Sequence, residues 1–488
     1  MPRSRKHVLT QEGLVRQYGS VVKSEEKSSL IKSRKINPNA LRTKNGKGDI
    51  YTSNLASKFM TLMTVKMSSL DPDGIGIEME SDKPGWYDSL NGLPGLFGSS
   101  TPEVFELKRF MLFFLESLNN NKTELISVPV ELALFFKNLR KLLDKKMSSF
   151  EFWDKSSSLR EEYRKSVVMG IDGKEEQIKA SEVIDFIKKA VNKINLGLTK
   201  AVDPKSGLYF TYFRYEALKY KKIDSKSIKG LPCVKVSEFK RNPLPLFLES
   251  EVHYFKTESD KANIKKHFTA LKNTGLYDKE LKMYKVCASL KTESNEIGRT
   301  RVFSPGWLEN EAVFMHMEYK YLLGLLKAGL YEEFFGSLKT CFPCFANPEI
   351  YGRSILENSS FISSSAFPDK RNWGRGFVAR LSGSTAEFID MWLTMALGIK
   401  PFFTDKNGML VFELKPLING EYFDKKGVYC AKLFAATDIV YINKSRKSTY
   451  LPSVQIKEIE ITWFNGSKET VSDSKITGEK AERIRNRQ

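Results

Sequence analysis

The sequence predicts a mainly α-helical chain that ends in a β domain. Apolar residues recur at three- and four-residue intervals through most of 51–200 and again through 310–397, the spacing of a buried helix face. After residue 405 the pattern changes to short runs separated by Asn and Gly turns, which is typical of strands. We therefore expect two domains in an α+β arrangement, a helical portion over 1–404 and a C-terminal β domain over 405–488.

Several helices have readable boundaries. Val104, Leu107 and Met111 share one face of a helix that follows the capping-box sequence Ser100-Thr-Pro-Glu103. A later helix should stop at Gly398. Further helices are expected at 12–18, 127–147, 157–168, 179–198, 310–328, 330–339 and 385–397, and strands at 408–414, 428–431, 438–443 and 454–464. Segments 209–213 and 246–254 fit a strand or a short helix equally well.

Composition describes a folded chain with a basic surface. Of the 488 residues, 41% are hydrophobic and 12% aromatic, which excludes a disordered protein. The charge balance is 78 − 58 = +20. Lysines are spread along the whole chain and no nucleic-acid-binding motif accompanies them, so we do not expect nucleic acid as a partner. A basic surface also suits an anionic substrate such as phosphate.

Cysteine usage and apolar runs indicate a reducing, aqueous compartment. The odd number of five cysteines argues against a disulfide scaffold. Cys341-Phe-Pro-Cys344 is a lone pair with no second pair or nearby His to complete a metal site, and we expect no metal or organic cofactor. No apolar segment follows the basic start at 1–6, and the longest apolar runs, such as 110–115, are far shorter than a membrane span. We expect a cytoplasmic protein.

A Gly- and Pro-rich loop carries the first candidate site. In Lys83-Pro-Gly-Trp-Tyr-Asp88 a carboxyl lies next to an indole. Poor solvation beside Trp86 would raise the pKa of Asp88 and suit a general acid, while the flat indole offers a platform for a sugar ring. The structural alternative is that Asp88 only caps a turn.

Two further segments carry candidate ligand-binding residues. In Trp307-Leu-Glu-Asn-Glu-Ala-Val-Phe-Met-His316, Glu309 and His316 are seven residues apart, which places them on one face if the stretch is helical. The alternative for His316 is a hydrogen-bonded core histidine. Ser382-Gly-Ser-Thr385 precedes a predicted helix, where amide groups, hydroxyls and the helix dipole favour an anion. The alternative there is an ordinary N-cap.

Together these segments resemble the signature stretches of glycoside hydrolase family 94, the inverting cellobiose and chitobiose phosphorylases. Gly85-Trp-Tyr-Asp-Ser-Leu-Asn91 resembles the family's Trp-Asn-Asp motif, which implies that Asp88 is the general acid and Trp86 a sugar contact. Glu309-Asn-Glu-Ala-Val-Phe-Met-His316 is similar to the family's Glu-Asn-Gly-Gly-x-x-x-His segment. This similarity implies that Glu309 contacts the sugar and His316 the phosphate.

The third segment completes the resemblance. Gly374-Arg-Gly-Phe-Val-Ala-Arg-Leu-Ser-Gly-Ser384 resembles the family's Gly-Arg-Gly…Thr-Gly-Ser phosphate loop and points to Ser382 and Gly383 as phosphate ligands. The Gly-Leu-Pro-Gly-Leu-Phe-Gly-Ser-Ser stretch is most similar to the 1,2-β-oligoglucan phosphorylase branch. Two positions differ from the family pattern: Tyr87 replaces an Asn and Glu311 a Gly.

The resemblance implies a fold and a reaction. The fold is an (α/α)6-barrel followed by a small β-sandwich or jelly-roll-like domain. Only 87 residues precede Asp88, so we expect the barrel to be incomplete at its N-terminal end, with a separate N-terminal half or a homodimer partner completing it. The reaction is inverting phosphorolysis of a β-glucan oligosaccharide to α-D-glucose 1-phosphate, with inorganic phosphate as co-substrate. One acid suffices, because phosphate is already an anionic nucleophile, whereas an inverting hydrolase needs a second carboxylate.

Three alternatives stay open. The chain is an inverting hydrolase with Glu78, Glu80 or Glu309 as base, a non-catalytic subunit that completes a separate N-terminal chain, or a basic nucleic-acid binder. The phosphorylase reading requires folding to bring Asp88 and the turn near Gly383 to opposite sides of one sugar-sized hollow.

Overall fold

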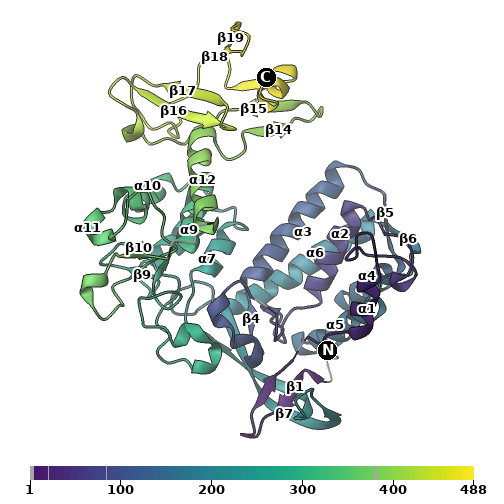
Figure 1. Cartoon of the computed structure of the whole chain (residues 1–488). Coiled ribbons are helices and arrows are strands. Elements are labelled where there is room, and N and C mark those ends of the chain that lie inside the picture. Colours follow the sequence, from purple (N-terminus) through teal and green to yellow (C-terminus); the bar gives the residue numbers. More distant parts are fainter. Residues whose placement is uncertain (1–4, 20, 84, 379–381) are drawn as a thin grey trace.

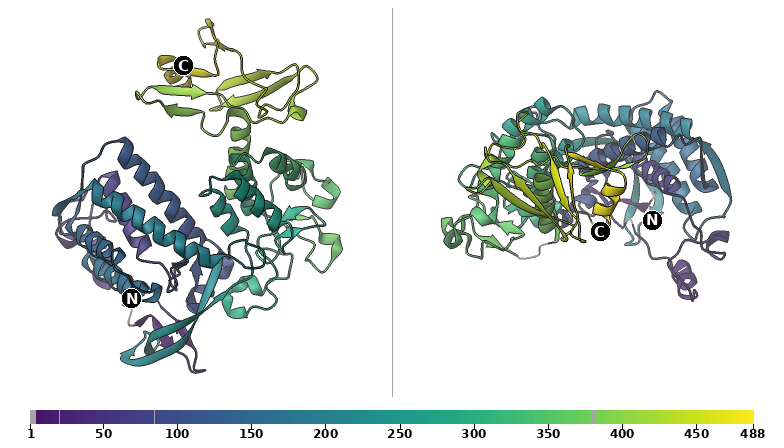
Figure 2. Two further views of the ribbon diagram at one scale, coloured as in Figure 1. Left: turned by 180° about the vertical axis from the view of Figure 1, so that it is seen from behind. Right: turned by 90° about the horizontal axis from the view of Figure 1, so that it is seen from above.

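The computed structural model describes residues 5–19, 21–83, 85–378 and 382–488, without the side chains of Ser382 and Gly383. Figure 1 shows two lobes side by side, one built on helices α2–α6 and the other on α7–α12, with the C-terminal strands above the second lobe. The same parts are seen from behind and from above in Figure 2, where the long hairpin of β7 and β8 extends from the lower edge. Helix α12 leads from the second lobe into the C-terminal strands (Figure 1).

The helices have the following bounds: α1 Glu25–Lys32, α2 Leu55–Met67, α3 Pro102–Asn120, α4 Val130–Leu143, α5 Ser149–Ser166, α6 Ala180–Leu198, α7 Glu249–Phe255, α8 Lys261–Leu271, α9 Met315–Lys327, α10 Tyr331–Cys341, α11 Pro348–Tyr351, α12 Ser382–Leu397 and α13 Glu479–Arg485.

The strands have the following bounds: β1 His7–Leu9, β2 Val15–Gln17, β3 Ile77–Glu78, β4 Ser99–Ser100, β5 Leu125–Pro129, β6 Glu175–Lys179, β7 Tyr212–Lys226, β8 Pro232–Pro243, β9 Tyr277–Asp278, β10 Met283–Tyr284, β11 Val313–Phe314, β12 Phe361–Ile362, β13 Gly376–Phe377, β14 Phe402–Thr404, β15 Leu410–Glu413, β16 Val428–Leu433, β17 Thr437–Ile442, β18 Ile459–Thr462, β19 Lys468–Val471 and β20 Lys475–Thr477.

The prediction of a mainly α fold built on an (α/α)6-barrel was wrong. Helices hold 39% of the residues and strands 20%, and a curled six-stranded antiparallel half-barrel lies in the N-terminal part of the chain. Its strand order is β2-β1-β8-β7-β4-β3. Most of these strands have only two or three residues, too few for an alternating pattern to be read, and β7 and β8 carry lysines on their exposed positions. The C-terminal strands form one three-stranded and two two-stranded sheets in place of the expected jelly-roll-like sandwich.

Helix predictions were accurate where a strong apolar face met a stop signal. Helix α6 lies within one residue of the predicted range, and α12 ends at Leu397 before Gly398, whose φ of 97° favours glycine. Helix α3 begins at Pro102 as expected, but the capping box does not form. Thr101 already has helical backbone angles, and its hydroxyl donates to the carbonyl of Phe210 instead, at 2.8 Å.

One other local prediction failed, and two open assignments were resolved. The 12–18 segment contains strand β2 and no helix. Of the two ambiguous segments, the first leads into strand β7 and the second contains helix α7.

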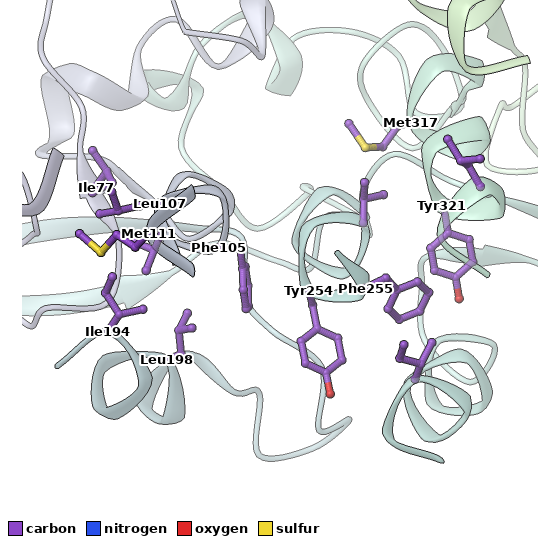
Figure 3. Packing of buried hydrophobic residues seen from close by; sticks show 14 of the residues in the cluster. Ile77, Phe105, Leu107, Met111, Ile194, Leu198, Tyr254, Phe255, Met317 and Tyr321 are labelled. Atoms are coloured by element: carbon purple, nitrogen blue, oxygen red, sulfur yellow. The ribbon is translucent and has the colours of Figure 1, made fainter. Parts of the chain in front are cut away.

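A single hydrophobic core joins the two lobes and thereby fixes the surface that carries the candidate site. Figure 3 shows residues of α3 and α6, such as Met111 and Ile194, continuing through Phe105 toward α7 and α9. The ring centroids of Phe105 and Tyr254 are 6.0 Å apart, and the next aromatic pair links α7 to Tyr321 of α9. Each buried aromatic side chain of this kind contributes about 1.5–3 kcal/mol. The helices that carry the site are therefore held rigidly together.

No helix among the described residues is both long enough and apolar enough to cross a bilayer.

Glu318 of α9 is a carboxyl inside this core. Its side chain is fully buried and its Oε1 accepts a hydrogen bond from the amide of Tyr284 at 2.9 Å. Among the described residues it forms no ion pair. Burial raises the pKa of Glu318 to about 8, although the Tyr284 amide and the Cys341 thiol lower it. The folded protein therefore keeps a proton on Glu318 at neutral pH.

We expect Glu318→Gln to stabilise the protein more as the pH rises. Below the ordinary pKa of 4.5 both folded and unfolded states hold the proton, and between 4.5 and about 8 only the folded state holds it. The free energy of unfolding of the native protein therefore falls as the pH rises through this window, whereas the uncharged Gln variant does not lose stability in this way. Thermal unfolding at about pH 5 and about pH 8.5 measures this, with Glu116→Gln on the exposed face of α3 as control. A gain in Tm that is equal at both pH values would contradict the assignment.

Candidate active site

A buried tyrosine fixes the loop that carries Trp86 and Asp88. The Tyr87 ring is 5% exposed and packs edge-on against Tyr212 and Phe247, with centroids 6.2 and 5.5 Å away. Its hydroxyl donates a 2.6 Å hydrogen bond to the carbonyl of Glu309. Tyr87 has extended backbone angles, so its neighbours point away from it. Trp86 is accordingly 46% exposed, and Asp88 is exposed at the start of a short 3-10 turn.

The structure brings Asp88 and Glu309 together. Glu309 accepts a hydrogen bond from the amide of Ser89 through its carboxylate, at 3.0 Å, although the two residues are 220 positions apart. Burial raises the pKa of Glu309, the Ser89 hydrogen bonds lower it, the charge of Asp88 raises it and that of Arg299 lowers it. The cluster is therefore a pair of neighbouring carboxyls in which the half-buried member, Glu309, has a pKa above its ordinary value.

The expected helix linking Glu309 to His316 does not exist. Residues Val313–Phe314 form strand β11, and α9 begins only at Met315. Leu308 and Glu311 have positive φ angles of 53° and 57°, which a helix cannot accommodate. Each of the two residues instead contacts the Trp86 loop, Glu309 at the Ser89 amide and His316 at the Trp86 ring.

His316 lies against the indole of Trp86. The centroid of its ring is 5.7 Å from that of Trp86, and the ring of Phe314 lies 5.9 Å from the same indole. On its other side, His316 Nε2 is 3.8 Å from Oε1 of Glu387, which is in the second turn of α12. His316 thus connects the Asp88 loop to the N-terminal part of α12.

The predicted phosphate ligands at the start of α12 can be placed only in part. The helix begins at Ser382, three residues before the predicted start, so the segment expected to precede the helix forms its first turn. The side chains of Ser382 and Gly383 and the preceding residues 379–381 lie outside the described residues. Their role as phosphate ligands therefore stays a prediction.

Sequence reasoning missed three charged residues of this cluster. Arg299 donates through its guanidinium to the carbonyl of Asp88 at 3.3 Å. Lys320 places its ammonium 5.3 Å from the centroid of the Trp86 ring. Burial would raise the pKa of Glu387, but the contact with His316 and the charge of Lys320 outweigh it and lower that pKa. Only Lys320 had a signal in the sequence, since it follows His316 by one helical turn.

The carboxylates considered as bases of a hydrolase differ in availability. Glu80 forms ion pairs with Lys6 at 2.8 Å and with Arg164 at 2.6 Å. Burial raises the pKa of Glu80, but these cations outweigh it and hold the pKa far below its ordinary value. Glu78 accepts a hydrogen bond from the Trp153 indole at 3.2 Å. Glu78 and Glu80 therefore have structural partners. Of the three candidate bases, only Glu309 contacts the Asp88 loop.

The sequence predicted a sugar-sized hollow between Asp88 and α12. Neither of the two clearest hollows among the described residues lies there. One, of about 410 Å³, is lined by residues of α8 and α10 and their surroundings, including Lys272, Tyr277 and Glu333. Another lies on α8. None of the predicted site residues lines either. The described residues also contain no group of His, Cys, Asp and Glu side chains of the kind that holds a metal ion.

No protein-family model matches the chain, and no curated protein is similar enough in sequence to count as a relative. The resemblance to glycoside hydrolase family 94 therefore rests on the motifs alone.

We expect Tyr87→Phe to cost about 0.5–1.5 kcal/mol of unfolding free energy, the usual net value of one hydrogen bond. The value should lie toward the lower end, because Thr300 also donates to the Glu309 carbonyl, at 2.7 Å. Urea denaturation measures the change. Tyr220→Phe, at an exposed position of β7, is the control. Equal stability of the two variants would show that the Tyr87 hydroxyl does not anchor the loop.

Proposed function

We propose that this chain cleaves β-glucosidic bonds, most closely those of β-1,2-oligoglucans, by inverting phosphorolysis that releases α-D-glucose 1-phosphate. The observation that supports this is the convergence of the Asp88 loop with Glu309 and His316. Tyr87 and Glu309, 222 residues apart, are joined by a direct hydrogen bond, and Trp86 contacts His316. Two of the three motifs that resemble family 94 thus meet, and Glu387, three residues after the third motif, lies 3.8 Å from His316. The fold is nevertheless not the one that the resemblance implies.

In the proposed mechanism Asp88 protonates the departing glycosidic oxygen. The exposed indole of Trp86 stacks on a sugar ring, and the carboxyl of Glu309 binds sugar hydroxyls. Phosphate, held near His316, Ser382 and Gly383, attacks the anomeric carbon from the face opposite to the leaving group. The C–O bond to the leaving sugar breaks as the C–O bond to phosphate forms, which inverts the configuration. Phosphate needs only to be positioned, so one carboxylic acid is sufficient.

Inverting hydrolysis is the second candidate, and one observation favours it. Glu387 is a carboxylate beside His316, and its lowered pKa keeps it ionised. A carboxylate at this position is suited to accept a proton from water, as is Glu309. Incubation of β-1,2-glucan oligomers and a panel of glucosyl disaccharides with and without phosphate separates the two reactions, because only a phosphorylase yields glucose 1-phosphate.

Under two alternative hypotheses the chain alone does not catalyse a reaction. If the protein is a subunit that completes a separate N-terminal half, activity appears only when that half is added. If it is a nucleic-acid binder, it binds DNA or RNA with a steep salt dependence. Our proposal includes a cytoplasmic location, where phosphate and glucose 1-phosphate are metabolically connected.

We expect Asp88→Asn to reduce kcat of phosphorolysis by more than about 100-fold, the usual scale for loss of a general acid. Asp82→Asn is the matched control, since Asp82 is an exposed carboxylate of the same loop. Measurement of glucose 1-phosphate release from a β-1,2-glucan oligomer checks this.

Glu309→Gln distinguishes the roles of the two carboxyls. A sugar-binding role predicts that this change raises KM for the glucan more than it lowers kcat. If Glu309→Gln abolishes kcat while Asp88→Asn retains most of it, the acid is Glu309, in agreement with its raised pKa.

A further inference from the structure

Charged side chains from four helices gather around Lys320. They come from α3, α7, α9 and α12, and most of them pair with each other. Glu106 of α3 contacts Nδ1 of His253 at 2.7 Å and the ammonium of Lys256 at 3.1 Å. Glu249 of α7 accepts a hydrogen bond from the Tyr212 hydroxyl. These carboxylates are therefore already matched by partners of their own.

His316 and Lys320 are less well matched. Their closest carboxylate contact is that of Glu387 with His316, and its 3.8 Å separation is longer than a good hydrogen bond. Within the described part of the chain, Lys320 forms no ion pair within 4 Å. Lys320 is nevertheless half-buried, and burial lowers its pKa while the charges of Glu387 and Glu249 raise it. A half-buried ammonium without a contacting anion is costly unless a ligand supplies one.

The position of Lys320 fits an oxyanion. His316 and Lys320 are four residues apart on α9, so both side chains extend from the same helix face. The Lys320 ammonium lies over the ring of Trp86. Trp86 is next to Tyr87, which anchors the Asp88 loop. An anion bound between His316 and Lys320 would therefore lie beside the indole on which a sugar ring stacks.

We infer that Lys320 and His316 together form the phosphate site, and that Glu387 is its resident counter-ion, which incoming phosphate displaces. This inference rests on the proposed function for the identity of the anion, but the site can be tested without catalysis. Glu387 is a weak partner for both, because it lies 3.8 Å from His316 and forms no ion pair with Lys320 within 4 Å. A phosphate oxyanion, with more charge and more acceptor oxygens, would bind each of them directly.

The charges predict opposite effects for two substitutions. Lys320→Met removes a cation and keeps the length of the side chain, and should weaken phosphate binding about tenfold or more, the usual effect of losing a charged hydrogen bond. Glu387→Gln removes the competing carboxylate and should strengthen phosphate binding by roughly two- to tenfold. Lys320→Arg keeps the charge and should retain most of the affinity.

The experiment is a titration of the full-length chain with inorganic phosphate, followed by isothermal calorimetry. Lys327→Met is the matched control, because Lys327 is on the same helix and pairs with Asp390 at 2.8 Å at the surface. Circular dichroism and thermal unfolding establish that each variant is folded. The inference is supported if Lys320→Met weakens and Glu387→Gln strengthens binding while Lys327→Met changes nothing.

Other outcomes separate this inference from the proposed function. Tight phosphate binding that depends on Lys320, without glucose 1-phosphate formation from any glucan, retains the anion site and rejects phosphorolysis. If the chain catalyses phosphorolysis but Lys320→Met changes neither the KM for phosphate nor the phosphate affinity, the role of Lys320 is rejected and the reaction is retained. Weaker phosphate binding in the Glu387→Gln variant rejects Glu387 as a competitor, and the absence of phosphate binding by the native chain overturns the site altogether.

Discussion

The hydrogen bond from the Tyr87 hydroxyl to the carbonyl of Glu309 is the contact on which the candidate site depends. It joins two segments that are 222 residues apart in the chain. The Tyr87 ring is buried against Tyr212 at the start of β7 and against Phe247 just before α7, so the loop is attached to the half-barrel and to the second lobe together. With this ring fixed inward, Trp86 and Asp88 must point outward.

The site combines a rigid support with an unbalanced charge distribution. The core that runs from α3 through α7 to α9 keeps the helices in place, so the positions of His316 and Lys320 are set by packing. Within the polar cluster, Glu106 and Glu249 have hydrogen-bond partners, whereas among the described residues Lys320 has no ion pair within 4 Å and the carboxylate contact of His316 is Glu387, at 3.8 Å. Binding sites commonly hold such residual charge, because the ligand completes the pairing.

The same arrangement explains why phosphorolysis and hydrolysis are close alternatives on this surface. Both reactions need a proton donor near the leaving oxygen, and the pair of Asp88 and Glu309 offers one. In the two proposed mechanisms the difference lies on the opposite side of the sugar, where His316 and Lys320 would bind phosphate and the carboxylate of Glu387 would activate water. The sign of the local charge decides between them.

The sequence by itself determined the local elements and the candidate residues. Apolar periodicity defined α6 to within one residue, and Gly398 as a stop signal defined the end of α12, because helix ends are specified by interactions within a few turns. Two of the motifs identified Trp86, Glu309 and His316 as candidate site residues, but nothing in the local sequence showed how the chain brings these motifs together.

Tertiary structure decided the rest. The half-barrel depends on pairing of the β7–β8 hairpin with β1 and β4, which are more than 100 residues away in sequence and too short to show a period, so the mainly α prediction failed. Positive φ angles at Leu308 and Glu311 exclude the helix that was expected between Glu309 and His316. In its place Val313 and Phe314 form strand β11, which pairs with β12. Arg299 and Glu387 enter the site through contacts that no short-range pattern encodes, because long-range packing alone brings such residues together.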